Sequence, residues 1–252
     1  MRLLIGASIV VAGLLSSTSD SLRSEDWTRF RGPNGQGRTP ERNLPLQWSE
    51  DSNVAWKTTI PGQGWSSPIV SGDHIFVTTA TDEGASCRVI GIDRTSGEIL
   101  WDSEVHRQIP GPKRAQNSYA TPTPVSDGAR IYAAFYDGTI VAVDFDGKLV
   151  WKNEDVDFHS LHGLGASPIL VGGLIVMPFD GSSREEQRVG WKEPWDQAVL
   201  LAVDKETGNT KWRGKRGLSR VGHVTAIAIE NGQTVVSAGG DRVQAHDVET
   251  GE

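Results

Sequence analysis

The 252-residue sequence contains a single cysteine, Cys87, so neither an intrachain disulfide nor a zinc site built from paired cysteines can form. The sequence also has fewer basic than acidic residues: 25 Lys and Arg against 32 Asp and Glu, which gives a net charge of −7. Binding to nucleic-acid phosphates needs clustered Lys and Arg, so we expect no nucleic-acid partner. No amphipathic helix pattern is evident either, which favours an all-β fold.

The longest apolar run is too short to cross a membrane. It extends from Leu3 to Leu15 after Arg2 and precedes several small residues, whereas a spanning helix needs roughly 20 apolar residues. We interpret residues 1–19 as a secretory signal peptide, with a retained N-terminal anchor as the alternative. The chain is therefore predicted to be periplasmic or secreted and soluble after cleavage. In such an oxidising compartment we expect Cys87 to be buried in a strand.

What the sequence does contain is an internal repeat built on Asp, Gly and Trp. In each copy an Asp precedes a glycine turn, and a Trp lies four residues after the glycine. An Asp carboxylate can accept hydrogen bonds from turn amides, and glycine readily adopts a positive φ. The copies are Asp93, Gly97 and Trp101; Asp144, Gly147 and Trp151; and Asp204, Gly208 and Trp212. Because strand side chains alternate, we expect Leu149 and Trp151 on one face of their strand.

A second pattern opens a short apolar strand in each unit, usually with a proline at its start. The residues in this position are Pro68, Pro122, Pro168 and, in a fourth unit, Thr225. A period of about 50 residues with four short strands per unit is typical of propeller blades. We predict a β-propeller of four-stranded antiparallel blades, with about four blades present. Trp-Asp pairs at Trp101 and Trp195 would suit WD repeats, but the rest of that signature is missing.

In these motifs the sequence resembles the PQQ-like repeat, or quinoprotein-type, β-propeller family. The resemblance covers roughly Asn53 to Glu252, and it implies that the repeat tryptophans pack between adjacent blades. Family members form closed rings of seven or eight blades, so we expect an incomplete ring, a piece of a longer protein, that self-associates through exposed blade edges. The expected organisation is a signal peptide (1–19), an extended segment (20–52) and incomplete propeller repeats (53–252), with a first strand around Val54–Thr58.

A ligand site is predicted at the mouth of the central channel, where the loops before the innermost strands converge. The candidate residues in these loops are Trp65, Asn117, Tyr119, His162 and His223. Their aromatic and imidazole groups could stack on a flat cofactor or a sugar, although they would also suit the rim of a packed ring. We interpret His159-x-x-His162 as too sparse for a metal site. An insertion from Asp180 to Gln197 is either a solvated loop or a lid over the mouth.

Two functions from different classes are consistent with these residues. The first is an exported, non-catalytic scaffold or recognition module of the cell envelope, with no cofactor and an unidentified protein partner or small-molecule ligand. The alternative, implied by the resemblance, is a fragment of a PQQ-dependent alcohol or sugar dehydrogenase that uses calcium. The first is favoured, because many family enzymes carry an adjacent cysteine pair under the quinone and Cys87 is alone. No nucleophile motif is present.

Overall fold

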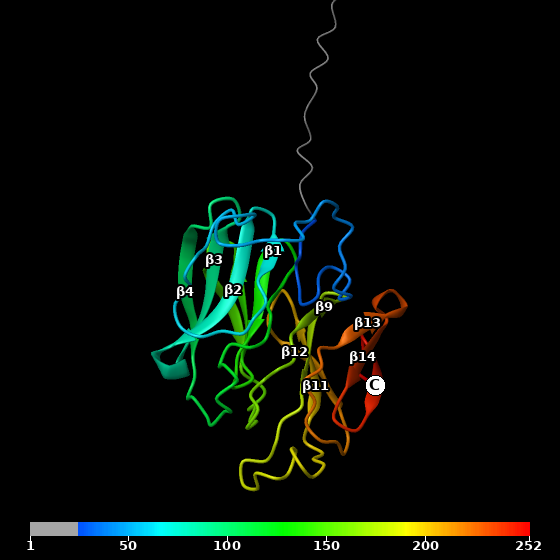
Figure 1. Cartoon of the computed structure of the whole chain (residues 1–252). Helices are drawn as coiled ribbons and strands as arrows, with labels where there is room; N and C mark the ends of the chain where they lie inside the picture. Colours follow the sequence, from blue (N-terminus) through cyan, green and yellow to red (C-terminus); the bar gives the residue numbers. More distant parts are fainter. Residues whose placement is uncertain (1–24) are drawn as a thin grey trace, which may run out of the picture.

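The computed structural model describes residues 25–252 as a series of antiparallel sheets arranged side by side in chain order (Figure 1). The strands are β1 (Ile69–Ser71), β2 (His74–Thr81), β3 (Ser86–Asp93), β4 (Ile99–Arg107), β5 (Val125–Ser126), β6 (Arg130–Ala134), β7 (Ile140–Asp144), β8 (Leu149–Asn153), β9 (Ile169–Val171), β10 (Leu174–Phe179), β11 (Val199–Asp204), β12 (Thr210–Lys215), β13 (Ile227–Ile229), β14 (Thr234–Ala238) and β15 (Val243–Asp247). Two single-turn 3₁₀ helices, η1 (Asp82–Gly84) and η2 (Glu230–Gly232), interrupt them.

These strands form four blades, which confirms the predicted all-β propeller fold. Blades 1 to 3 have four strands each, in the orders β1-β2-β3-β4, β5-β6-β7-β8 and β9-β10-β11-β12. Blade 4 has three strands, in the order β13-β14-β15. The predicted signal peptide, residues 1–19, lies outside the described residues. In the part of the chain that the structure describes, no helix has the length and apolar character needed to span a bilayer.

A row of hydroxyl groups connects the starts of the innermost strands. The backbone N–H of Ser67 donates to Thr123 Oγ1 at 3.0 Å, that of Thr123 to Ser167 Oγ at 2.9 Å, and that of Ser167 to Thr225 Oγ1 at 3.0 Å. Each blade is thus joined to the next by the same bond. These bonds also correct the sequence alignment at two positions. The equivalent of Pro68 is Pro124 rather than Pro122 in the second unit, and Ala226 rather than Thr225 in the fourth, because Thr225 aligns with Ser67 and Ser167. The second unit has two prolines, and the sequence alone did not show which one precedes the strand.

The hydrophobic core is divided among the interfaces between neighbouring blades. At the first interface, Ile69 and Phe76 of blade 1 pack with Ile131 and Val141 of blade 2. Cys87 is buried in the same cluster, as expected, and burial raises the pKa of its thiol. Two further clusters join blade 2 to blade 3 and blade 3 to blade 4. Each blade therefore depends on its neighbours for burial of its faces, as in other repeat proteins.

At the outer part of each interface, a Trp of one blade rests on the glycine turn of the next. The Trp101 indole N–H donates to the Phe145 carbonyl at 2.7 Å, and a Cβ on Gly147 would lie 2.7 Å from the Trp101 ring. The turn itself is closed by Asp144 Oδ1, which accepts a hydrogen bond from the Lys148 N–H. The equivalent pairs are Trp56 on Gly97, Trp151 on Gly208 and Trp212 on Gly251. In the same turns, Asp93 and Asp204 accept the corresponding amide hydrogen bonds.

The sequence analysis missed Trp56 as a member of this set. Its indole donates to the Arg94 carbonyl at 3.1 Å, just as the other three tryptophans bond to the following turn. The strand expected around Val54–Thr58 is absent from the structure, because this backbone has no partner strand among the described residues. The pattern Val54-x-Trp56 matches Leu149-x-Trp151, and this match could have identified Trp56 as a docking tryptophan.

A β-bulge before each repeat Trp corrects the expected strand alternation. In blade 2 the pairing slips by one residue, so that Ala142 faces Trp151 while Val143 faces Leu149. Leu149 is consequently 40% exposed whereas Trp151 is 9% exposed, and the two side chains do not share a face. Blades 1 and 3 carry the same irregularity at the same position. The bulge re-aims the Trp side chain toward the neighbouring blade.

The contact between Trp101 and Gly147 should be measurable as a difference between two glycine substitutions. Gly147 and Gly128 have similar φ angles of 83° and 89°, but a Cβ on Gly128 would meet nothing within 4 Å. Gly128→Ala should cost about 1–2 kcal/mol through backbone strain. Gly147→Ala should cost a further ~1–3 kcal/mol through overpacking. Urea unfolding of both variants tests this, and equal losses would contradict the docking role.

An ion pair between blades 2 and 3 should make stability depend on acid pH. Burial alone would raise the pKa of Asp127, but the Lys205 ammonium and the N–H groups of Ala129 and Arg130 outweigh it and lower the pKa to about 2. This contribution is present above the ordinary pKa of about 4 and is lost as pH falls through about 2. Asp127→Asn should lose about 1–2 kcal/mol near neutrality.

The measurement for Asp127→Asn is chemical unfolding of variant and parent from neutral pH to about pH 2. Their difference in unfolding free energy should shrink below about pH 4. The exposed Asp146, whose carboxylate forms no ion pair or hydrogen bond within residues 25–252, provides the control Asp146→Asn. A constant difference for Asp127→Asn across the whole range would show that the ion pair does not contribute in this way.

Candidate functional site

The loops that lead from one blade to the next lie together at one end of the molecule, which we call the crossover end (residues 108–124, 154–168 and 216–226). Consecutive loops touch one another there. The Trp65 indole N–H donates to the Gln116 carbonyl at 2.8 Å, and the Trp65 backbone N–H donates to the Ala120 carbonyl at 2.9 Å. Trp65 is nevertheless 56% exposed, so one aromatic face remains available at this end.

The structure brings three of the five candidate residues together. Asn117 donates from its side-chain amide to the His162 carbonyl, and the His162 ring lies 5.9 Å from the His223 ring in an edge-to-face arrangement. Gly165 allows this approach, because a Cβ there would lie 2.9 Å from the His223 ring. The three residues come from the loops that precede blades 2, 3 and 4, so one contact network crosses two blade boundaries.

Tyr119 is separated from that group and lines a different cavity. Its hydroxyl donates to the Gly111 carbonyl at 2.8 Å, and its ring packs on Gly84 and lies 5.1 Å from the Tyr136 ring. Lys113 lies over the ring at 5.0 Å. With both sides of the ring in contact, Tyr119 is poorly placed to stack on a flat ligand.

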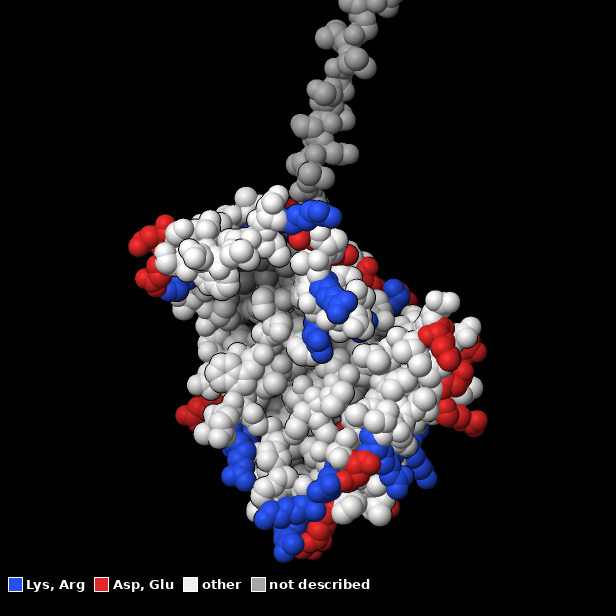
Figure 2. All heavy atoms as spheres, turned by 45° about the vertical axis from the view of Figure 1, so that its right-hand side comes forward, with Lys and Arg blue, Asp and Glu red and all other residues white. Residues whose placement is uncertain are grey.

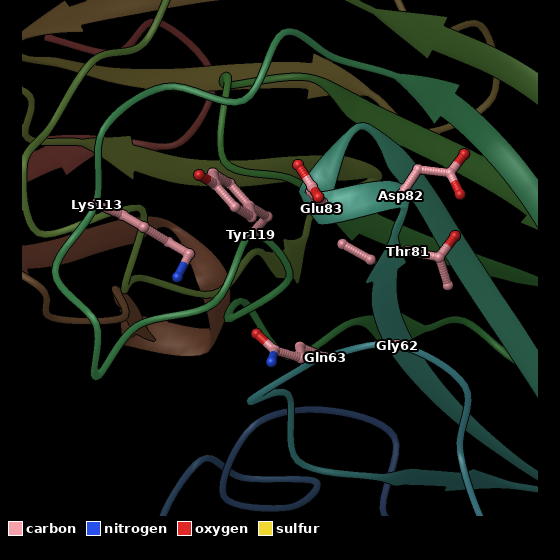
Figure 3. Close-up of a pocket in the computed structure, with 9 residues that line it drawn as sticks. Gly62, Gln63, Thr81, Asp82, Glu83, Lys113 and Tyr119 are labelled. Atoms are coloured by element: carbon pink, nitrogen blue, oxygen red, sulfur yellow. The ribbon is translucent and has the colours of Figure 1, made fainter.

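The cavity beside Tyr119 is open to solvent and has a volume of about 530 Å³. Figure 3 shows Lys113 and Tyr119 on one side of it and Glu83 on the other, with Gln63 below. Asp82 and Glu83 hold positive φ angles of 51° and 59°, which are uncommon for residues other than glycine. The cavity therefore carries two carboxylates on a tight turn and the Lys113 ammonium on a separate loop.

Partial burial and neighbouring groups lower the pKa values of the two imidazoles at the crossover end. Burial lowers the pKa of His223, and the nearby His162 lowers it further. Burial likewise lowers the pKa of His162, with a second contribution from the Arg114 guanidinium. His162 Nε2 is buried without a hydrogen-bond partner among the described residues. The ring nitrogen therefore has hydrogen-bonding capacity that no described residue uses.

The insertion predicted from Asp180 to Gln197 is anchored to blades 3 and 4 at both ends. The buried Arg216 donates to the Asp180 carboxylate at its start and to Ser237 on β14. Near its end, Trp195 and Ser219 exchange two backbone hydrogen bonds of 2.8 and 3.0 Å. These contacts hold the insertion at the crossover end, next to the candidate residues.

The insertion contributes residues that the sequence analysis did not select. The Trp191 ring lies 5.6 Å from the His162 ring, with the Arg114 guanidinium 5.6 Å and the Lys192 ammonium 4.6 Å from its centroid. We call Arg114, His162, Trp191, Lys192 and His223 the Trp191 patch. Trp191 stood out in the sequence as an aromatic residue in a charged insertion, but nothing there indicated its meeting with Arg114.

Residues that follow the predicted signal peptide run along the inner edges of the blades. Trp27 forms two backbone hydrogen bonds with Val70 on β1, and the Thr28 carbonyl accepts one from Ser126 on β5. Phe30 and its neighbours then border a small cavity with residues 223–227 of blade 4. Figure 1 shows this segment in dark blue beside β1, reaching toward β9 and β13. The inner edges of β1 and β5 are therefore partly covered.

A calcium-assisted quinone, the cofactor of the alternative function, does not fit the described residues. Calcium takes about six to eight oxygen ligands, many of them carboxylates. Within residues 25–252 no group of three or more His, Cys, Asp or Glu side chains is placed to hold a metal ion. The inner edges of β1 and β5 are in addition partly covered, because Trp27 and Thr28 form backbone hydrogen bonds with them.

Comparison with known proteins gives two groups of relatives. The family model described as "Outer membrane protein assembly factor BamB" matches residues 42–176. The assembly factor BamB of Bordetella pertussis is 24% identical over 87% of this chain and 58% of its own length. The 1-butanol dehydrogenase (quinone) of Thauera butanivorans is 25% identical over 71% of this chain and 28% of its own length. The chain thus spans about half the length of the assembly-factor relatives that it matches.

Solved structures show the same fold in both groups. The quinohemoprotein alcohol dehydrogenase of Comamonas testosteroni superposes with a TM-score of 0.64 at 16% identity, covering 90% of this chain and 40% of that one. BamB of Moraxella catarrhalis gives a TM-score of 0.51 at 18% identity, covering 79% and 49%. At these identities the likeness establishes the propeller fold and nothing about chemistry.

The coupling of the two imidazoles should be visible in a titration. In His162→Gln the pKa of His223 should rise, because the Coulombic contribution of His162 is removed. It should remain below the ordinary value of about 6.5, because burial is the larger cause. Nuclear magnetic resonance of the imidazole carbons against pH measures both, with His159, whose pKa is lowered by burial and Arg184, as the internal control. An unchanged or lower pKa of His223 would contradict the coupling.

Proposed function

Because the chain belongs to the PQQ-like repeat family described as outer membrane protein assembly factor BamB, we propose that it is a non-catalytic scaffold or recognition module of the cell envelope. The observation that carries this proposal is the extent of the likeness to assembly factors. The Bordetella pertussis relative aligns with 87% of this chain, and three further relatives bear the same name. A module of this kind works through surfaces rather than through a reaction centre.

The arrangement of residues supports the same conclusion. The crossover end presents Trp65 and the Trp191 patch at its surface, where a partner could bind. The inner edges of β1 and β5, by contrast, are covered by Trp27 and Thr28. The names of the relatives support a place in the envelope, in agreement with the predicted export of the chain. Its periplasmic or secreted location and self-association through blade edges stay predictions.

The proposal is tested by removing the gene for the complete protein from its host. If the protein is an assembly scaffold, the abundance of outer-membrane proteins should fall, as measured by quantitative mass spectrometry of isolated outer membranes. The gene for the parent sequence should restore it, and Gly147→Ala, with its weakened blade interface, should restore it less well.

The enzyme alternative makes the opposite prediction in the same strain. Loss of a quinone-dependent dehydrogenase would abolish a dye-linked oxidation of alcohols or sugars that needs added PQQ and calcium, while outer-membrane proteins would stay at their normal level. In a fluorescence titration, PQQ should then quench the tryptophan fluorescence of the purified protein in a saturable manner. That pair of results would overturn the scaffold proposal.

A further inference from the structure

The Trp191 patch holds two cations that have no acidic partner. Arg114 and Lys192 are both exposed and rest on the Trp191 ring, yet neither forms an ion pair within residues 25–252. Two other cations of the insertion are paired: Arg184 with Asp157 at 2.6 Å and Arg188 with Glu193 at 3.1 Å. A cation held over an aromatic ring keeps its charge directed outward for a further partner.

The other residues of the Trp191 patch carry no negative charge. The charge that acts on His162 comes from Arg114, and the one that acts on His223 comes from His162. His162 Nε2 is buried and has no hydrogen-bond partner within residues 25–252, so the patch also contains an unused hydrogen-bonding atom. In a chain whose net charge is −7, this is a local positive site. Figure 2 shows Lys and Arg side chains gathered at the lower end of the viewed face, with acidic side chains among them and along the sides.

Exposed apolar side chains also lie in other loops of the crossover end. Trp65 is 56%, Leu218 54% and Val224 47% exposed, although most large apolar residues of the blades are buried. Aromatic residues, arginine and apolar side chains are the groups enriched at the centres of protein interfaces. The composition of this surface therefore matches a protein interface with one sign of charge.

We propose that the Trp191 patch binds an extended, acidic segment of a partner protein in which carboxylates alternate with apolar side chains. The carboxylates would pair with Arg114 and Lys192, and the apolar side chains would lie against Trp191 and the exposed apolar residues of the crossover end. Charge complementarity carries this choice, since the patch is positive and the rest of the chain is acidic. The inference rests on the proposed function as a recognition module and names the class of its partner.

The test uses a short fluorescein-labelled peptide that alternates glutamate with leucine or phenylalanine, and fluorescence anisotropy with the purified chain. The peptide should bind saturably at low salt and more weakly at about 0.15 M salt. A peptide with glutamine in place of glutamate should bind at least about tenfold more weakly, because it cannot form the ion pairs. Equal binding of the two peptides would overturn the proposal.

Two double variants locate the binding. Arg114→Glu with Lys192→Glu should weaken binding of the acidic peptide at least about tenfold, since like charges then face each other. The control, Lys148→Glu with Lys57→Glu, changes the net charge equally but lies outside the crossover end, and it should leave affinity within about twofold. Both pairs are exposed, so circular dichroism should show folded proteins. Equal losses in the two variants would assign the effect to net charge and overturn the site.

Two further measurements distinguish peptide recognition from binding by charge alone and from binding to a membrane. Trp191→Ala keeps both charges but removes the aromatic ring on which the two side chains rest. It should also weaken peptide binding severalfold. The protein should bind vesicles containing phosphatidylglycerol no better than neutral vesicles. If it preferred the anionic vesicles, and Arg114→Glu with Lys192→Glu abolished that preference, the ligand of the patch would be a membrane surface and the peptide proposal would be wrong. If peptide binding fails while loss of the gene still depletes outer-membrane proteins, the partner class is wrong and the scaffold proposal stands.

Discussion

The packing of one tryptophan on the glycine turn of the next blade is the contact on which the rest of the molecule depends. It occurs four times, at Trp56, Trp101, Trp151 and Trp212, and each indole also donates to a carbonyl of the turn that it covers. Near the axis, a backbone N–H of one blade donates to a hydroxyl of the next, and the acceptors are Thr123, Ser167 and Thr225. Each of the three interfaces between blades 1 to 4 is therefore fixed at an outer and an inner point, with its apolar cluster between them.

This construction explains why the crossover end can carry exposed aromatic and cationic groups. Because burial takes place between blades, the loops contribute little to the apolar cores and are free to differ from unit to unit. The insertion of blade 3 illustrates this freedom: Arg216 and Ser219 hold it in place, while Trp191 remains partly exposed beside His162. Binding groups can thus be added without changing the repeated contacts that hold the blades together.

The repeat made most of the fold predictable, because Asp, Gly and Trp recur at fixed spacing and each has one structural use. The failures are of three physical kinds. Trp56 lacks the preceding glycine turn, so the repeat motif did not include it although it docks like the others. The exposed Leu149 results from a bulge, and a bulge shifts alternation without leaving a composition signal. The choice between Pro122 and Pro124 depended on a hydrogen bond to Ser167, which spacing could not supply.

The candidate site was less predictable, because its contacts join residues far apart in the chain. Repeat equivalence placed Asn117, His162 and His223 in neighbouring loops, and the structure brings them into one network. Tyr119 has an equivalent place in its loop but does not join this network, because its ring is enclosed by Gly84 and Lys113. Comparing the repeats could not identify Arg114 as a site residue, because Trp191 reaches its side chain only through the path of the insertion. Sites that arise where a regular scaffold meets an irregular insertion need a three-dimensional structure, because no repeat period encodes the meeting.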